Sequence, residues 1–271
     1  MTNIKEITCL GIFFLFLILS QTYSVCHSSE LFTGAWKNIK ENIQGIEGLE
    51  DLAVGAGALI ATKPYTDVDE EVSAVPIIVG RYKHFYVDGT SLGYILHEGG
   101  ESGLEFSMVG KPRFMGYDSD DGAGLTGMED REWSLDGGLR MVWAHDLFEV
   151  SLTGLADLLG HHEGQEVSAV ISKKFFEGSL TPRIGVKWQS ADMIDYYYGV
   201  RSNEVRSGRA SYLGDDTVNW VAGVTIAVPM GEAWAFTVDF EYEGLGDEIE
   251  DSPIVNDHEV LTHVVGIVYR F

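Results

Sequence analysis

Side chains alternate between apolar and polar along several segments of this chain. Between Ala233 and Glu243 every second residue is large and apolar, and the intervening residues become acidic toward the end of the segment. The same alternation recurs in residues 148–158 and 180–189. Successive side chains of a β-strand point to opposite faces, so a period of two predicts strands that each have one apolar face. The apolar residues of the first segment are Trp234, Phe236, Val238, Phe240 and Tyr242.

The positions of the aromatic residues favour a membrane barrel over a soluble β-sandwich. Alternation alone fits both, because a sandwich also buries one face of each strand. Trp133 and Trp143, however, bound one segment on the same face, and Trp220 opens another. Aromatic girdles at the two interfaces of a membrane barrel produce this arrangement, whereas a sandwich core buries large rings centrally. Other aromatic residues near strand ends are Trp188, Tyr242 and Tyr269.

Charged residues in the middle of the predicted strands indicate a water-filled lumen. Arg140, Arg183 and Lys187 lie on the face opposite the apolar one. Barrel interiors are polar, and charges of opposite sign can pair across a narrow lumen. A barrel plugged in this way would conduct poorly or not at all. The acidic residues that we expect to pair with them are Asp136, Asp157, Asp239 and Glu241.

The C-terminus has the pattern of a strand that ends on an aromatic residue. Residues 258–271, HEVLTHVVGIVYRF, place Tyr269 and Phe271 on one apolar face. Outer-membrane barrels end in this way, and the terminal Phe with an aromatic residue two positions before it resembles the signal read by the barrel-assembly machinery. A soluble domain has no physical reason to end on an exposed Phe in mid-strand. We therefore predict that Tyr269 and Phe271 form an assembly signal and that the chain contacts outer-membrane lipid and lipopolysaccharide.

The N-terminal 50 residues are predicted to lie outside the barrel. Residues 7–20, ITCLGIFFLFLILS, form an apolar core too short for a spanning helix and typical of a signal peptide, which we assign to residues 1–26. Lipidation at Cys26 is the alternative, but Val25 is a poor residue before a lipidation site. Apolar residues spaced by three and four predict a short amphipathic helix or periplasmic linker over residues 27–50, and a poorly ordered tail is the other interpretation.

The composition excludes disorder and nucleic-acid binding. Of 271 residues, 45% are hydrophobic, and 42 acidic residues against 18 basic ones give a net charge of -24. Such a chain repels polyphosphate. The barrel is assigned to residues 51–271, and at about 10 residues per spanning strand it has room for roughly 11 strands. Even numbers are preferred, so we predict ten or twelve strands, with residues 74–86 forming one of them and residues 196–213 forming a strand or a loop.

Clusters of acidic residues fill several predicted connections. They lie at 67–71, 118–121 and 247–251. A calcium site is one hypothesis, since Asp118 has Glu129 eleven residues later, but Gly122 is misplaced for a calcium-binding loop. Solvated acid at the barrel rims is the favoured interpretation.

The remaining candidates for chemistry are weaker. His161 and His162 stand beside Glu163, and a polar turn is favoured over a metal site or an acid–base pair. A hydrolase is disfavoured because the chain has no G-x-S-x-G motif. We therefore predict no catalytic, cofactor-binding or metal-binding residue.

Three consecutive tyrosines form the densest aromatic group. Tyr196, Tyr197 and Tyr198 are followed by Gly199 and Val200. Clustered tyrosines are good anchors for a protein partner, so they are candidate interaction residues. Structural roles, as a girdle or as a loop folded into the lumen, are the competing interpretation.

The chain resembles the MipA/OmpV family of outer-membrane barrels. The resemblance covers the chain from Ala53 onward, and one departure is the segment Tyr65–Asp69, where family members commonly have a Gly soon after the Tyr. It is carried by AVGAGAL at 53–59, Pro-Tyr at 64–65, LTGMEDR at 125–131, YYGV at 197–200, SPIV at 252–255 and the ending YRF at 269–271.

The resemblance implies a non-enzymatic role. The family's best-described member resembles a scaffold that joins a murein lytic transglycosylase to a peptidoglycan synthase, and these two enzymes are the implied partners. The alternatives are a passive channel for small solutes and a surface adhesin or interaction protein. No catalytic residue is implied at any position of this chain.

Overall fold

The barrel is built from antiparallel strands that follow one another in sequence order. The computed structural model describes residues 48–271, and in it each strand pairs with its sequence neighbours while β1 pairs with β12 and closes the sheet. The strands are β1 (Leu49–Ala61), β2 (Glu71–Tyr82), β3 (Phe85–Asp88), β4 (Ser91–Glu98), β5 (Leu104–Arg113), β6 (Ser134–Ala144), β7 (Glu149–Asp157), β8 (Gln165–Ser172), β9 (Leu180–Gln189), β10 (Thr217–Met230), β11 (Trp234–Gly244) and β12 (Glu259–Arg270).

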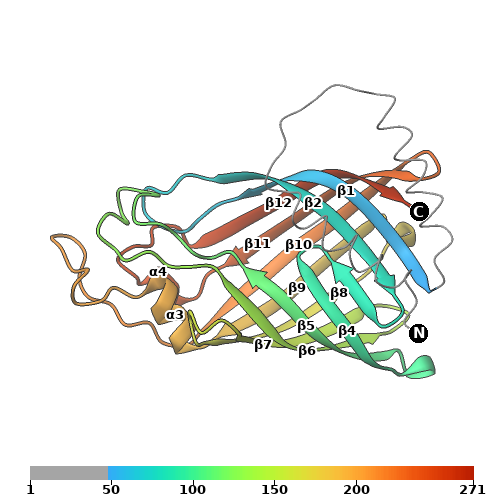
Figure 1. The fold of residues 1–271 in the computed structure, drawn as a ribbon, viewed down its shortest axis with the longest axis horizontal. Coiled ribbons are helices and arrows are strands. Elements are labelled where there is room, and N and C mark those ends of the chain that lie inside the picture. Colours follow the sequence, from blue (N-terminus) through green and yellow to red (C-terminus); the bar gives the residue numbers. More distant parts are fainter. Residues whose placement is uncertain (1–47) are drawn as a thin grey trace, which may run out of the picture. The chain divides into compact units, whose positions relative to one another are not determined.

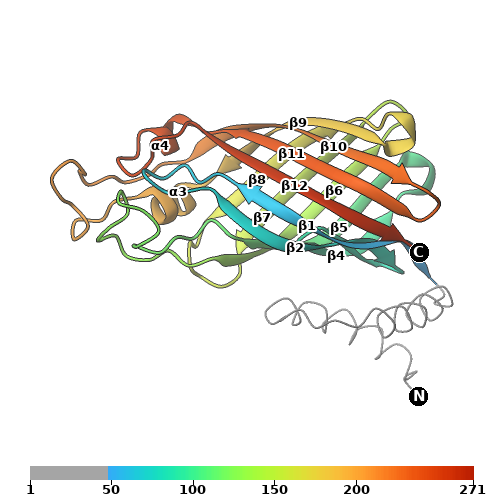
Figure 2. The same ribbon diagram turned by 90° about the horizontal axis from the view of Figure 1, so that it is seen from above.

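The two ends of the barrel differ in the length of their connections (Figures 1 and 2). Long loops at 62–70, 114–133, 158–164, 190–216 and 245–258 gather at one end with the helices α3 (Ala191–Tyr198) and α4 (Asp247–Glu250). We call this the loop end. The other end, the turn end, carries short connections, including the 3-10 turns η2 (Gly100–Ser102) and η3 (Phe176–Gly178), and the end of β12. The short connection between β3 and β4 lies partway along the wall.

The outer wall presents apolar side chains between two aromatic girdles. Trp133 at the loop end is 53% exposed and Trp143 at the turn end is 41% exposed. Ten residues of strand span about 33 Å, which at the usual tilt covers an apolar band about 25 Å tall. The predicted girdles are confirmed by the ring pairs Trp220–Tyr242, with centroids 4.8 Å apart at the loop end, and Trp234–Tyr269, 5.0 Å apart at the turn end.

The closing seam depends on glycines in β1. A Cβ atom on Gly55 would lie 2.0 Å from the carbonyl oxygen of Ile267 in β12, and one on Gly57 would lie 2.5 Å from that of Val265. Only glycine lets the two strands approach so closely. The small-residue pattern of residues 53–59 therefore reflects the geometry of the seam.

The wall is incomplete next to the short strand β3. The ladder between β2 and β3 starts at Val79, and the ladder between β4 and β5 ends at Gly110. Residues 71–77 of β2 and 111–113 of β5 therefore have a strand partner on one side only. Pro76 and Pro112 lie in these two segments. Proline has no backbone N–H, so it is tolerated where a strand has no hydrogen-bonded partner on one side.

The prediction of ten or twelve strands is confirmed, since the described residues form twelve. Residues 74–86 were assigned to one strand and contain parts of two, because the chain reverses at Lys83 with a φ of 56° and no Gly or Pro marks the turn. Residues 196–213 form the end of α3 and a loop. Within residues 48–271 no helix is long and apolar enough to cross a membrane. The predictions for residues 1–26 and for most of 27–50 lie outside the described residues.

Candidate functional site: a loop cap and a turn-end cavity

The loops at the loop end share one hydrophobic core, which we call the loop cap. Met193 and Ile194 of α3, Leu125 of the 114–133 loop and Ile249 of α4 are all 0% exposed. Since these side chains come from three separate connections, the loops fold against each other at the mouth of the barrel. The other buried members of the cap are Tyr65, Tyr117, Met128, Tyr197, Tyr198, Val200, Leu245 and Ile254.

The sequence segments that carried the family resemblance converge in this cap. Tyr65 donates a hydrogen bond to the carbonyl oxygen of Met115 at 3.4 Å and its ring packs edge-on against Tyr117. Ser252 of the SPIV segment donates to the carbonyl oxygen of Tyr198 at 2.6 Å. Four of the six segments, from four loops, therefore build one structural unit.

A buried ion pair ties two of these loops together. The carboxylate of Glu204 accepts hydrogen bonds from the Arg131 guanidinium at 3.0 Å, from the Glu129 amide at 2.8 Å and from the Arg201 amide at 2.7 Å. Burial raises the pKa of Glu204, but these donors and the charge of Arg131 outweigh it, so the net pKa lies below the ordinary value. Arg131 also donates to the carbonyl oxygen of Tyr196 at 2.6 Å.

The tyrosine cluster lies inside the loop cap. Tyr197 and Tyr198 are buried and Tyr196 is half-buried. Burial raises the pKa of both Tyr197 and Tyr198. For these two side chains the geometry fits the competing interpretation, a packed loop. The role of Tyr196–Tyr198 as interaction residues stays a prediction, which a partner-binding experiment can test.

A belt of polar side chains lines the lumen below the cap. The Gly164 amide donates to Nδ1 of His162 at 3.1 Å, so Nε2 carries the proton and donates to Asp136 at 3.0 Å. Arg113 joins Asp136, at 2.7 Å, to Glu166, at 3.0 Å. From Glu166 hydrogen bonds and ion pairs continue through Gln189, Asn219, Glu243, Lys187, Glu241, Arg183 and Asp239.

The predicted charge pairing holds for part of the lumen. Arg183 pairs with Asp239 at 2.8 Å and with Glu241 at 3.0 Å, as expected. Asp157 instead accepts hydrogen bonds from Ser134 and from backbone amides of the 158–164 loop, because it ends β7 beside that loop. Among the acidic residues of 48–271, Arg140 approaches only Asp88, at 3.9 Å. Arg113, which lies at the end of β5, was missed because alternation alone assigns no role to a strand-terminal residue.

Among residues 48–271, two groups of acidic or histidine side chains have the spacing of possible metal ligands. The buried group, Asp136, Asp157 and His162, is fully engaged in the hydrogen bonds described above. The exposed group, Asp118, Asp120 and Asp121, includes an ion pair from Asp121 to Lys63 at 3.6 Å. Hydrogen bonds account for the buried group, and the three side chains of the exposed group lie in solvent, so neither group strengthens the calcium hypothesis.

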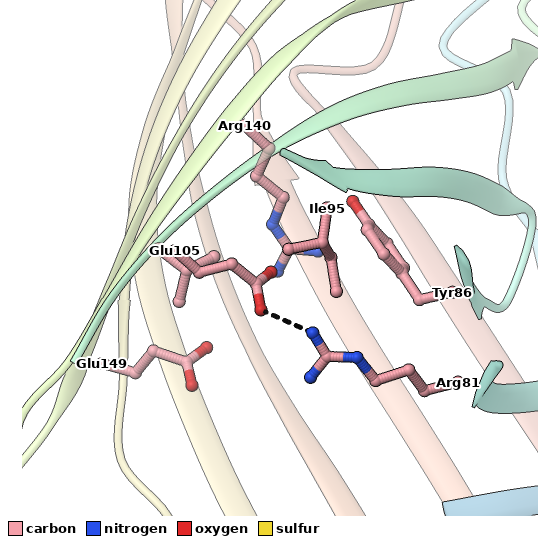
Figure 3. Close-up of a pocket in the computed structure, with 7 residues that line it drawn as sticks. Arg81, Tyr86, Ile95, Glu105, Arg140 and Glu149 are labelled. Atoms are coloured by element: carbon pink, nitrogen blue, oxygen red, sulfur yellow. Dashed lines mark hydrogen bonds and ion pairs between the residues drawn. The ribbon is translucent and has the colours of Figure 1, made fainter. Parts of the chain in front are cut away.

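The turn end of the lumen contains an open cavity of about 220 Å³ (Figure 3). Arg81, Arg140, Glu105 and Glu149 direct their charged groups toward the same space, which Tyr86 also faces. The cavity is completed by two apolar side chains, Ile95 and Val142. It differs from the loop end, where the centre of the cap is apolar and buried.

Comparison with known proteins decides the family. The family model for MltA-interacting protein MipA matches residues 54–271. The chain belongs to this family. This MipA-family chain is 32% identical to the outer membrane protein YiaT of Escherichia coli K12, over 82% of its own length and 91% of that protein. It is 28% identical to the MltA-interacting protein of the same strain, with 81% and 90% coverage, and 27% identical to OmpV of Vibrio cholerae, with 57% and 61% coverage.

The comparisons confirm three predictions. The family resemblance, the barrel fold and the outer-membrane location all agree with the relatives and with the structure. In a barrel of this kind the short turns face the periplasm and the long loops face outward. The loop cap of this MipA-family chain therefore closes over the outer mouth, and the turn-end cavity opens toward the periplasm.

Proposed function

We propose that this protein is an outer-membrane scaffold that binds a periplasmic cell-wall enzyme through its turn end. A murein lytic transglycosylase is the proposed partner, and a peptidoglycan synthase is the second one that it would bring alongside. Support comes from a relative named MltA-interacting protein. The barrel-assembly machinery and lipopolysaccharide are proposed contacts of any protein inserted in this membrane.

The turn end is proposed as the partner-binding end because it carries an exposed aromatic residue with a strained backbone. Phe176, in the connection between β8 and β9, is 77% exposed and has a φ of 51°, and Glu177 beside it has a φ of 56°. A left-handed conformation costs a bulky residue about 1–2 kcal/mol. Strained residues cluster at binding sites, and exposed aromatic residues are frequent anchors of protein interfaces.

The loop end and the lumen argue against a wide passive channel. The cap packs apolar side chains over the outer mouth, and the belt below it links charged and polar side chains from β5, β6, β8, β9, β10 and β11. Both features would obstruct the passage of solutes through the lumen. A surface adhesin would instead use the exposed residues of the loops, such as Leu213.

The test compares one residue at each end. A tagged chain, its Phe176→Ala variant and its Leu213→Ala variant are captured from mildly solubilised envelopes, with an unrelated barrel as control. Leu213 is a matched choice because it is 79% exposed at the loop end. We expect to recover a lytic transglycosylase with the unchanged chain and with Leu213→Ala. With Phe176→Ala the amount recovered should be at least tenfold lower. Equal recovery with all three chains, or recovery no greater than the control, would contradict the proposal.

A further inference from the structure

The turn-end cavity contains one cationic side chain with a single long ion pair and one anionic side chain with no protein partner among the described residues. Arg140 forms no hydrogen bond within the described residues, and its one ion pair is the 3.9 Å approach to Asp88, whose side chain is itself exposed. The carboxylate of Glu149 has neither an ion pair nor a hydrogen bond within residues 48–271. The two groups also lie too far apart to pair with each other.

The other charges of the cavity are already satisfied. Arg81 pairs with Glu98 and with Glu105, the latter at 3.5 Å, and its Nε donates to the carbonyl oxygen of Lys83 at 3.3 Å. Arg140 and Glu149 are therefore the two groups from which a ligand would gain most. A charged side chain that is partly enclosed by protein forms a stronger hydrogen bond with a charged ligand group than a fully water-exposed side chain does.

The strand register sets the separation of the two groups. Arg140 pairs with Thr153, and Glu149 lies four positions nearer the turn end on the same strand, β7. Four residues of strand correspond to about 13 Å between the backbones. Both long side chains reach into the space between, so a ligand that contacts both must carry its charges at opposite ends.

The apolar wall of the cavity is fixed by packing. Tyr86 lies flat over Gly93, where a Cβ atom would come within 2.1 Å of its ring, and its hydroxyl is 3.2 Å from the Oγ atom of Ser107. Together with Ile95, which is 3% exposed, and the partly exposed Val142, the ring gives the ligand body an apolar surface. The volume of about 220 Å³ is below the roughly 300–1,000 Å³ of sites for drug-sized ligands, which favours a small molecule.

We propose that this cavity binds a short zwitterionic peptide from the periplasm. Arg140 takes the carboxylate, Glu149 takes the ammonium group, and the wall of Tyr86 and Ile95 contacts the small apolar side chains between them. A free dipeptide and a cell-wall fragment with a free ammonium and a free carboxylate group share this chemistry. The inference does not depend on the scaffold role, because it requires only the protein and the peptide.

The test uses ligands that differ by one charge. Binding of Ala-Ala to the purified barrel in detergent at low ionic strength is measured by calorimetry, beside N-acetyl-Ala-Ala, which lacks the ammonium group, and Ala-Ala amide, which lacks the carboxylate. We expect Ala-Ala to bind and each blocked form to bind at least tenfold more weakly. Free alanine, whose two charges are too close together, should also bind more weakly. A diaminopimelate-containing muropeptide in a separate arm distinguishes the two sources by its affinity relative to Ala-Ala.

Variants assign each charge to its partner. Arg140→Gln should remove the difference between Ala-Ala and its amide, and Glu149→Gln should remove the difference between Ala-Ala and its N-acetyl form. Lys174→Gln and Glu232→Gln are matched controls, since both residues are exposed at the same end of the barrel and outside the cavity. Both controls should bind as the unchanged chain does.

Two results would overturn the proposal. One is the absence of Ala-Ala binding at millimolar concentration, and the other is equal binding of the blocked and unblocked peptides. If a variant fails to fold, as judged by loss of the mobility shift on boiling, the blocked peptides still decide the question because they change the ligand and leave the protein intact.

Discussion

The guanidinium of Arg131 lies 3.0 Å from the carboxylate of Glu204, and both side chains are 1% exposed. The pair joins the 114–133 loop to the 190–216 loop, so the loop cap depends on a contact between residues far apart in sequence. Removing one partner of a buried pair leaves an uncompensated charge, at a typical cost of about 3–5 kcal/mol.

Arg131→Met is predicted to open the loop cap and leave the barrel folded. Limited proteolysis should cut residues 190–216 much faster in this variant, while the mobility shift on boiling persists. Arg201→Met is the control, because its ion pair with Glu129 is half exposed and such pairs contribute little. Equal cleavage of the two variants would show that the buried pair does not hold the cap.

Acidification is predicted to weaken the cap through Glu204. Its pKa is lowered in the folded state, so its contribution to stability is complete above the ordinary value of 4.5 and is lost as pH falls through the lowered pKa. A fluorophore attached at Leu213→Cys can report cap opening in urea. The urea midpoint should stay constant from pH 7 to about pH 5 and fall below that, whereas Glu204→Gln should show a flatter dependence. Identical pH profiles would exclude Glu204 as the titrating group.

Tyr117→Phe is predicted to leave the cap as stable as before or slightly more stable. The Tyr117 hydroxyl is buried and is the one such side-chain atom without a hydrogen-bond partner within residues 48–271. Deleting an unsatisfied polar group removes a desolvation cost and no bond. Ser252→Ala, which loses the 2.6 Å bond to Tyr198, should instead destabilise the cap by about 1 kcal/mol. The same urea assay compares them, and a clear loss of stability in Tyr117→Phe would contradict the prediction.

The phenol of Tyr117 also predicts an alkaline transition. Burial raises its pKa to about 12, against the opposing charge of Arg131. Below its ordinary value of 10 the phenol is neutral in the folded and the unfolded state, so it causes no pH dependence there. Between pH 10 and about 12 only the unfolded state ionises, so the stability of the cap falls as pH rises through this range. Burial and the carboxylate of Glu248 also raise the pKa of Tyr212 to about 12. Ultraviolet titration should therefore show ionisation of tyrosines near pH 12, with a smaller amplitude in Tyr117→Phe.

Gly55→Ala is predicted to impair closure of the barrel. The added Cβ atom would meet the Ile267 carbonyl oxygen at 2.0 Å, and backbone cannot yield by that much. Gly154→Ala is the matched control, since a Cβ atom there meets nothing within 4 Å. We expect the first variant to lose most of its mobility shift on boiling and the second to retain it. Normal folding of both would mean that the seam adjusts more readily than the structure implies.

The alternation of side chains predicted most of the barrel because it reports which face of a strand meets lipid. Arg183 and Ile184 are adjacent residues of β9 and point to the lumen and to the outer surface as their polarity requires. The β2–β3 turn was missed because Lys83 adopts a positive φ without a sequence signal. Local pattern cannot show a turn whose conformation is imposed by the strands on either side.

The loop cap could not be predicted because its contacts are tertiary. His162 was assigned to a polar turn, yet its ring is buried and is held between Gly164 and Asp136. The only available signal was the family resemblance, whose segments turned out to contribute Tyr65 and Ile254 to one core. Sequence spacing gives no information on loops that meet across the mouth of a barrel.

The orientation of the barrel is tested most directly by measuring from which side of the membrane each end can be labelled. Single cysteines replace Leu213 at the loop end and Phe176 at the turn end, in a Cys26→Ser background, and intact cells are treated with a maleimide carrying a polymer too large to cross the outer membrane. We predict that Leu213→Cys is modified in intact cells and that Phe176→Cys is modified only after the outer membrane is permeabilised. Modification of Phe176→Cys in intact cells would contradict a periplasmic turn end and the scaffold role built on it.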